Sequence, residues 1–248
     1  MAKIILPPTQ VNAGVQRGYF KRVNTLAKNA ILQFSKQAVS IGHFGRKSDA
    51  IDAILSLRRS HEIPKDKLSE PVRWAVMKVM ASNDKIMGKS IKDAASIKVD
   101  FPYDEFMNDA VQALIARNTE EVAKFVDYGV QKTSDLIIDS VTSGFDIQKL
   151  SKAFREIIGI KQRQAERLAR NQIHYATTIL EDARRESLGI TKAIWMHSHA
   201  GKTPRPEHLA FDGKEYDIRK GAYLEGKWTK PGLEYGCRCL SQSVLEIL

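Results

Sequence analysis

The sequence predicts a mainly α-helical protein, with a long-helix N-terminal body and a small α+β C-terminal module. Apolar residues recur at steps of three and four along most of the chain before Gly189, which is the spacing of one helix face. Glycine and proline are frequent after that point and exclude another long helix. Both cysteines and three of the six histidines also lie in this last stretch, so its composition differs from that of the body.

The N-terminal residues 1–8 are expected to form an extended arm, because Pro7 and Pro8 favour polyproline-like geometry. Thr9 is a suitable N-cap for a helix over residues 10–40. Further apolar patterns of helical spacing predict helices over residues 50–59, 67–96, 104–143, 146–157 and 161–188.

The helix over residues 104–143 is expected to break at residues 118–121, where a new cap can form. We expect a body over residues 1–145 and a module over residues 146–248. Within it, the irregular stretch from Trp195 to Cys239 is too short to bury enough apolar surface to be stable alone, so it needs docking onto the helices before it, a metal clip, or both. Its expected elements are strands over residues 193–196 and 214–216 and one helical turn over residues 206–211.

The positive charge of the chain is concentrated in its first hundred residues. The net charge is +10, and residues 1–100 hold 18 Lys and Arg against 8 Asp and Glu, which gives +10 by subtraction. Residues 101–248 hold 21 of each kind and are neutral. Such a surface attracts polyanions, so we expect non-specific contacts with double-stranded DNA; a lysine-rich solvated surface is the alternative. The expected contacts are Arg17, Lys21, Lys28, Arg46 and Lys47.

The sequence contains no run of about 18–20 apolar residues, so no membrane association is expected. The apolar stretch at the N-terminus is too short for a signal peptide. Bridging Cys237 and Cys239 would close a tight, strained ring, so a disulfide is not expected. These features favour synthesis in a reducing cytoplasm.

The last part of the chain resembles a known family in its pattern W…T-x-R-P-x-H…D-G-K…P-G…C-R-C. The pattern is similar to that of the phage Mu F-like head morphogenesis domain of tailed bacteriophages, and the similarity extends over Asp146 to Cys239. Upstream, Gly159-Ile160 and the run from Ala169 to Gln172 also match. The residues that carry the pattern are Trp195, Thr203, Arg205, Pro206, His208, Asp212, Gly213, Lys214, Pro231, Gly232, Cys237, Arg238 and Cys239.

This resemblance implies a structural minor capsid protein that acts in head assembly. Family members are typically encoded beside the portal protein and occur in few copies per virion, and some leave the head with the DNA. The expected location is therefore inside the capsid, near the portal vertex. The implied partners are the portal protein, the major capsid protein and packaged DNA, with the chain present as an oligomer or in several copies.

Two interpretations of the cysteine and histidine cluster remain open. Thiolate and imidazole groups are zinc ligands, and His199, His208, Cys237 and Cys239 could supply four. A branch of the similar family carries C-x-x-C where this chain has residues 205–208, which looks like a metal site. The alternative is a metal-free clasp in which Arg205 and Glu234 form an ion pair and Pro231-Gly232 makes a turn. The clasp residues are Trp195, Arg205, His208, Asp212, Gly213, Pro231, Gly232, Glu234, Cys237 and Cys239.

A catalytic role is the less favoured interpretation. His197, His199, Arg205, His208 and Asp212 could serve phosphodiester or acyl chemistry, but no Ser or Cys is expected to face a base. The alternatives to a structural protein are a nuclease or effector enzyme injected by a phage, and a stand-alone nucleic-acid-binding protein of the host. Both Trp195 and Trp228 are expected to anchor the core, because isolated aromatic side chains usually pack inside.

Overall fold

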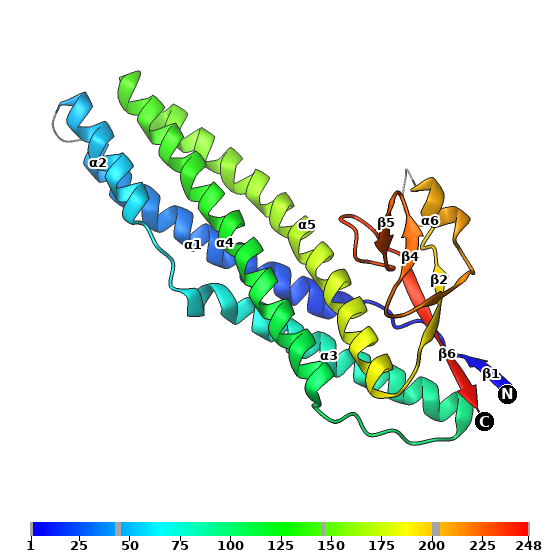
Figure 1. The fold of residues 1–248 in the computed structure, drawn as a ribbon. Helices are drawn as coiled ribbons and strands as arrows, with labels where there is room; N and C mark the ends of the chain where they lie inside the picture. The colour runs from blue at the N-terminus through cyan, green and yellow to red at the C-terminus, as the bar shows by residue number, and fades with distance from the viewer. Residues whose placement is uncertain (1, 43–45, 145–146, 200–203, 248) are drawn as a thin grey trace. The chain divides into compact units, whose positions relative to one another are not determined.

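The fold is given by a computed structural model, which describes residues 2–42, 46–144, 147–199 and 204–247 (Figure 1). The packing of Cα atoms divides the chain into two compact units. The first unit contains Met1–Gln16, Trp74–Ile115 and Arg170–Leu248, and the second contains Arg17–Arg73 and Ala116–Ala169. The sequence-based boundary between residues 145 and 146 lies outside the described residues and stays a prediction.

Long helices dominate the described residues, as the sequence predicts. None of the described helices is long and apolar enough to cross a membrane. The helices are α1 (Ala13–Gly42), α2 (Lys47–Ser60), α3 (Lys65–Ala95), α4 (Glu105–Thr142), α5 (Ile147–Ser187) and α6 (Pro206–Ala210). The strands are β1 (Ala2–Ile5), β2 (Lys192–Met196), β3 (Glu215–Asp217), β4 (Ala222–Leu224), β5 (Lys227–Thr229) and β6 (Leu240–Ile247).

Two of the expected helix breaks are absent. Helix α4 continues through residues 118–121, where Asn118 and Thr119 are buried, and α5 continues through residues 158–160. One glycine inside a helix costs about 1 kcal/mol relative to alanine, which the packing of a long apolar face can exceed. The two helices expected over residues 146–157 and 161–188 are therefore one.

The start of α1 also differs from the expectation. The side-chain oxygen of Asn12 accepts the backbone N–H groups of Gly14 and Val15, at 2.9 and 3.1 Å, and so caps the helix. The Thr9 hydroxyl instead donates to the carboxylate of Glu181 at 2.9 Å. The prediction of Thr9 as the cap is therefore wrong, because this residue makes a tertiary contact within the first unit.

In the second unit, α1, α4 and α5 approach closely at a glycine. A side chain at Gly129 of α4 would lie 2.9 Å from Ile31 of α1 and 3.4 Å from the stem of Lys161 on α5. The ammonium of Lys161 lies over the rings of Phe125 and Tyr128, 4.9 and 4.2 Å from their centroids. Burial lowers the pKa of Lys161 to about 8. The small residue at 129 therefore sets how closely these helices pack.

The first unit contains a four-stranded antiparallel sheet in the order β1-β6-β2-β3. Figure 1 shows the C-terminal strand β6 between the N-terminal strand β1 and β2. Ala193 of β2 pairs with Ser243 of β6 on one side and with Tyr216 of β3 on the other. The expected N-terminal arm is thus partly wrong: residues 2–5 are extended, but they form an edge strand because β6 offers them an unpaired backbone.

A separate hairpin, β4-β5, projects two aromatic side chains into solvent. Glu225 and Gly226 connect its strands with positive φ angles of 53° and 77°, which suits the right-handed twist of a hairpin. Tyr223 and Trp228 pair across the strands, with ring centroids 5.5 Å apart, and are 61% and 62% exposed. The expectation that Trp228 anchors the core is therefore wrong, whereas Trp195 is fully buried as expected.

A buried charged cluster joins the end of α5 to the sheet. The Arg185 guanidinium is 0% exposed and donates to Glu181 and Asp182 of its own helix, at 2.9 and 2.8 Å. It also donates to the hydroxyls of Ser241 and Ser243 on β6, at 2.8 and 2.9 Å. Every side of this cation therefore has a partner, which is what makes its burial tolerable.

The adjacent residue, Arg184, faces a different element of the same unit. Its guanidinium binds both carboxylate oxygens of Asp84 on α3, at 2.6 and 2.9 Å. It is 2% exposed. Two successive arginines thus hold the last turn of α5 to the sheet and to α3.

Replacing Arg185 by leucine should lower the free energy of unfolding by about 3–5 kcal/mol, because Glu181 would lose its buried counter-ion and Asp182 would keep only Lys230. Urea denaturation followed by circular dichroism measures this loss. Arg219→Leu is the control, since the Arg219 side chain is 74% exposed and its pair with Glu186 should contribute far less. Equal losses in the two variants would contradict the structural role given to Arg185.

Candidate functional site

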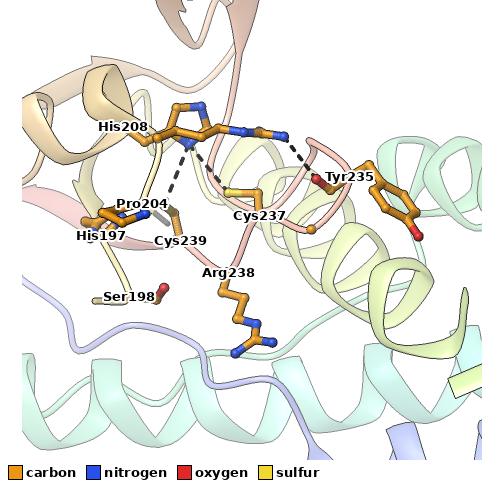
Figure 2. Close-up of a pocket in the computed structure, with 10 residues that line it drawn as sticks. His197, Ser198, Pro204, His208, Tyr235, Cys237, Arg238 and Cys239 are labelled. Carbon is orange, nitrogen blue, oxygen red and sulfur yellow. Dashed lines mark hydrogen bonds between the residues drawn. The ribbon is translucent and has the colours of Figure 1, made fainter. Parts of the chain in front are cut away.

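The candidate site brings one histidine and both cysteines together. His208 comes from α6, and Cys237 and Cys239 come from the segment that leads into β6. The His208 Nδ1 lies 3.7 Å from the Cys237 sulfur and 3.9 Å from the Cys239 sulfur, as the dashed contacts in Figure 2 show. The two thiols are free, so the expectation of no disulfide is confirmed. The expected approach of Cys237 to His208 is confirmed as well.

Trp195 fixes the position of His208. The indole of Trp195 packs edge to face against the His208 ring, with centroids 5.0 Å apart, and also against Phe211 and Tyr216. Trp195 and Cys239 belong to the same apolar cluster as Ala193, Tyr216, Ile218, Ala222 and Leu224. His208 is 2% exposed, so its ring has little freedom to turn away from the thiols.

The Asp212-Gly213 turn holds the chain that follows β2. The Asp212 carboxylate accepts the backbone N–H of His197 at 2.8 Å, and this bond lowers the pKa of Asp212. Gly213 takes a positive φ of 76° and donates its N–H to the carbonyl of Trp195. His199 also pairs with Asp212, at 3.1 Å, and so does not join the thiols. The inclusion of His199 among the metal ligands is wrong for this reason.

The segment before the cysteines returns through a tight turn. Leu233 donates its N–H to the carbonyl of Lys230, with Pro231 and Gly232 between them, and Gly232 has a φ of 82°. Proline followed by a residue of positive φ is the pattern of a type II turn, as expected. A side chain at Gly232 would lie 2.8 Å from the Thr178 hydroxyl, so glycine is also required by space.

Three side chains of α5, those of Asn171, Thr178 and Asp182, bind this returning segment. The Thr178 hydroxyl donates to the carbonyl of Pro231 at 2.7 Å. Asn171 accepts the backbone N–H of Gly236 at 3.2 Å. Lys230 pairs with Asp182 at 2.9 Å. These contacts dock residues 230–236 onto α5, which is the docking that the stretch from Trp195 to Cys239 requires.

The expected ion pair between Arg205 and Glu234 does not form. Glu234 accepts from Lys227 at 2.8 Å and from the Thr229 hydroxyl at 3.2 Å; the Lys227 bond chiefly lowers the pKa of Glu234. Arg205 donates through one terminal nitrogen to the carbonyl of Tyr235 at 3.0 Å. Residue 234 faces the hairpin because the chain turns between residues 230 and 237, and only its neighbour reaches Arg205. The clasp is therefore closed by a hydrogen bond from the Arg205 side chain to the backbone and not by an ion pair.

The second terminal nitrogen of Arg205 is buried and has no hydrogen-bond partner among the described residues. The same holds for the Nε2 atom of His208. Both residues line a pocket of about 290 Å³ together with His197, Ser198, Tyr235 and the cysteine segment (Figure 2). In Figure 2 the side chain of Arg238 extends away from the thiols. A ligand that supplies a hydrogen-bond acceptor would satisfy a buried N–H donor of this kind at the wall of a pocket.

The pair of thiols and the imidazole can do two kinds of chemistry. A hydrogen bond from Cys239 lowers the pKa of Cys237, and the same contact together with burial raises the pKa of Cys239. A half-buried thiolate beside an imidazole can act as a nucleophile or as a metal ligand. The expectation that no Cys faces a base is thus corrected, because Cys237 lies beside His208.

The donor set fits a metal with three protein ligands. The one nitrogen and the two sulfurs all lie within 4.8 Å of one another. A tetrahedral zinc with bonds of about 2.3 Å to sulfur and about 2.0 Å to nitrogen separates these atoms by roughly 3.5–3.8 Å. The contacts of 3.7 and 3.9 Å are close to that geometry. A closed four-ligand site of the structural kind does not fit, because His199 is held by Asp212.

The residues predicted to contact DNA lie on the surface of the second unit. Arg17, Lys21 and Lys28 are exposed on α1 and share one face at helical spacing. Arg46 precedes α2 and Lys47 is its first residue, where the ammonium donates to the carbonyl of Thr142 at 3.1 Å. Contact of these residues with DNA phosphates stays a prediction.

Sequence reasoning missed Asn171, Thr178 and Lys230, which dock the returning segment, and the cluster around Arg185. These residues lie on a helix or in a turn, where polar residues usually face solvent. The only sequence signal for the Arg185 cluster is the high number of charged residues from Glu181 to Glu186, which follow a helix face of small residues. The strand β6 was missed too, although its run from Leu240 to Ile247 alternates polar and apolar residues near its end.

The lowered pKa of His174, which lies near the site, predicts that this residue makes the folded protein less stable in acid. Burial, followed by the charges of Arg238 and Arg170, lowers the pKa of His174 from 6.5 to about 4. At His174 the folded state therefore binds fewer protons than the unfolded state, so the contribution of His174 to stability should be constant above pH 6.5 and fall between pH 6.5 and 4. The loss should be on the order of 2 kcal/mol after allowance for partial exposure.

Urea denaturation of wild type and His174→Gln across this pH range measures the effect. The variant should lose this component of the acid dependence, whereas His199→Gln at the exposed histidine should keep it. An unchanged acid dependence in His174→Gln would show that other groups cause it.

Part of the chain matches a known protein family. Residues 131–242 match the family described as Phage Mu protein F like protein. An uncharacterized protein of Haemophilus influenzae is 24% identical over 140 residues, which are 56% of this chain and 30% of that protein. The chain thus spans less than a third of the length of this relative. No solved structure matches. The match over residues 131–242 confirms the resemblance to the Phage Mu protein F-like family seen in the sequence.

Proposed function

We propose that this chain is a minor structural protein of a tailed-phage head that acts in head assembly at the portal or the inner capsid wall. The family match over residues 131–242 is the observation that carries this proposal, since it indicates a phage head morphogenesis protein. The location that follows is the interior of the virion, with several copies near the portal vertex. In this proposal the chain also contacts packaged DNA and leaves the head with the genome, as some family members do.

The contacts of the candidate site support a structural role. His208 and Cys239 are buried and pack against Trp195, and the returning segment is fastened to α5 at three points. Groups held in this way determine the shape of the module. Partners must then bind exposed groups, and the β4-β5 hairpin carries two large exposed aromatic side chains.

The β4-β5 hairpin offers a contact surface for another virion protein. Tyr223 and Trp228 are more than half exposed, and Tyr235 is 72% exposed on the segment that follows the hairpin. Aromatic side chains are enriched at the centres of protein interfaces and contribute a large share of their affinity. We propose that the hairpin contacts the portal protein or the major capsid protein.

Changing Tyr223 and Trp228 together to serine should sharply reduce incorporation of the chain into heads, because the variant removes the proposed interface but no core residue. Quantitative mass spectrometry of purified heads measures the incorporation. Tyr103→Ser is the matched control, since Tyr103 is 51% exposed on the connector between α3 and α4. Normal incorporation of the double variant would remove the hairpin from the proposal.

The basic face of α1 supports contact with DNA. Arg17, Lys21 and Lys28 are exposed and follow one another at steps that place them on one side of the helix. Each phosphate neutralised by such a residue releases counter-ions, so affinity should depend on salt and not on sequence. With about four phosphate contacts, log affinity should fall with log salt at a slope of roughly −4.

Replacing Arg17, Lys21 and Lys28 by glutamine in the full chain should flatten that slope by about 0.9 for each phosphate that is no longer neutralised. Fluorescence anisotropy with duplexes of unrelated sequence measures the slope at several salt concentrations. The control replaces Lys85, Lys89 and Lys92, three exposed lysines of α3, and removes the same net charge. If both triple variants change the slope equally, general charge and not the face of α1 causes the binding.

An enzyme injected with the genome is the second candidate, favoured by the half-buried thiol of Cys237 beside His208. Two conditions would have to hold for this candidate. The purified chain would have to cleave DNA or another substrate, and both Cys237→Ser and His208→Ala would have to abolish that activity. Activity that survives either change would assign it to a contaminant or another site.

A further inference from the structure

The pocket beside the cysteines combines a three-donor cluster with a half-buried arginine that lacks a full set of acceptors. His208, Cys237 and Cys239 direct one nitrogen and two sulfurs toward a common point. Arg205 lines the same pocket and has one buried terminal nitrogen without a hydrogen-bond partner among the described residues. Neither observation depends on the role of the chain in a phage head.

Three protein ligands leave one position of a tetrahedral ion empty. Zinc sites that serve structure alone usually have four protein ligands, whereas three ligands leave a position for water or another small ligand. In this chain the three donor residues also line the pocket, so the pocket has space for a further ligand beside them. The other candidate ligands lie outside the donor cluster: His197 lines the pocket but is not among the clustered donors, His199 pairs with Asp212, and Glu234 pairs with Lys227.

The charge around the open position favours an anion. A divalent cation bound by two thiolates and one imidazole has no net charge at its ligand set, so the Arg205 guanidinium is an additional positive group. Its other terminal nitrogen is already held by the carbonyl of Tyr235, which fixes the direction of the guanidinium. An oxygen anion at the open position would give the unpartnered nitrogen a charge-assisted hydrogen bond.

We propose that His208, Cys237 and Cys239 bind one zinc-class cation with an open fourth position, and that Arg205 binds the anion that completes it. Binding of the cation releases the protons of those thiols that are not yet ionised. The anion is a carboxylate or a similar small oxygen or nitrogen anion, and a pocket of about 290 Å³ has room for it. The site is then a place where a small anion or an acidic side chain of a partner can attach to the module.

Cobalt(II) tests the cation site directly, because its visible absorption reports the number and the type of ligands. The full chain, purified in a phosphine reductant without chelator, is titrated with cobalt(II) alone. We expect about one equivalent to bind with thiolate-to-cobalt absorption, and His208→Ala and Cys239→Ser to lose it. Absence of such absorption in folded wild type would overturn the cation site.

Azide and acetate then test the open position in the cobalt-loaded chain. In wild type each anion should shift the ligand-field bands in a saturable way. In Arg205→Gln the cobalt should still bind, but the affinity for the anions should fall at least about tenfold, since the variant cannot donate a charged hydrogen bond. Arg205→Lys keeps the charge and should retain part of the affinity, which separates loss of charge from damage to the fold.

Arg205→Cys provides the opposite test. A fourth thiolate should close the site, strengthen the thiolate-to-cobalt absorption and make the spectrum insensitive to azide and acetate. The proposed role of Arg205 would be overturned if neither anion changed the wild-type spectrum. It would also be overturned if wild type and Arg205→Gln bound the anions with equal affinity. Circular dichroism of each variant confirms that the chain is folded before the spectra are compared.

Discussion

The buried guanidinium of Arg185 is the interaction on which the first unit depends. A cation removed from water is stable only when its surroundings supply acceptors in every direction, and here two carboxylates and two hydroxyls do so. The carboxylates belong to α5 and the hydroxyls to β6, so the same group that must be satisfied also ties the sheet to the helix. Thr9 extends the cluster to the N-terminal residues through Glu181, whose pKa burial raises to about 7.

This constraint also positions the candidate site. Ser241 follows Cys239 by two residues, and alternation along an extended segment places Cys239 on the buried face with the hydroxyl that Arg185 holds. The segment before Cys237 is fastened to α5 by Thr178 and Asn171. Contacts with α5 therefore hold the chain before Cys237 and after Cys239, and so keep the two sulfur atoms beside His208. A role as a head protein needs this rigidity, because a small module must keep its hairpin in one orientation to bind a partner.

The sequence predicted the parts of the fold that depend on local pattern. The long helices, the strand at Trp195, the turn at Pro231-Gly232 and the approach of Cys237 to His208 all follow from apolar spacing, turn chemistry or the family pattern. The failures concern tertiary choices. Glu234 has two possible cations within reach, and the sequence does not reveal that the turn directs it to Lys227. Trp228 was assigned to the core by residue type, whereas its place in a two-stranded hairpin decides its exposure.

Native-state hydrogen exchange of the wild-type chain tests the role of Arg185 in the first unit most directly. If Arg185 joins α5 to the sheet, the backbone amides of β6, of β2 and of the last turns of α5 should open in one cooperative event with the same free energy. The amides of the β4-β5 hairpin should exchange at a lower free energy, because two of its largest side chains are exposed. Exchange of β6 at a clearly lower free energy than the end of α5 would show that the buried cluster does not hold them together.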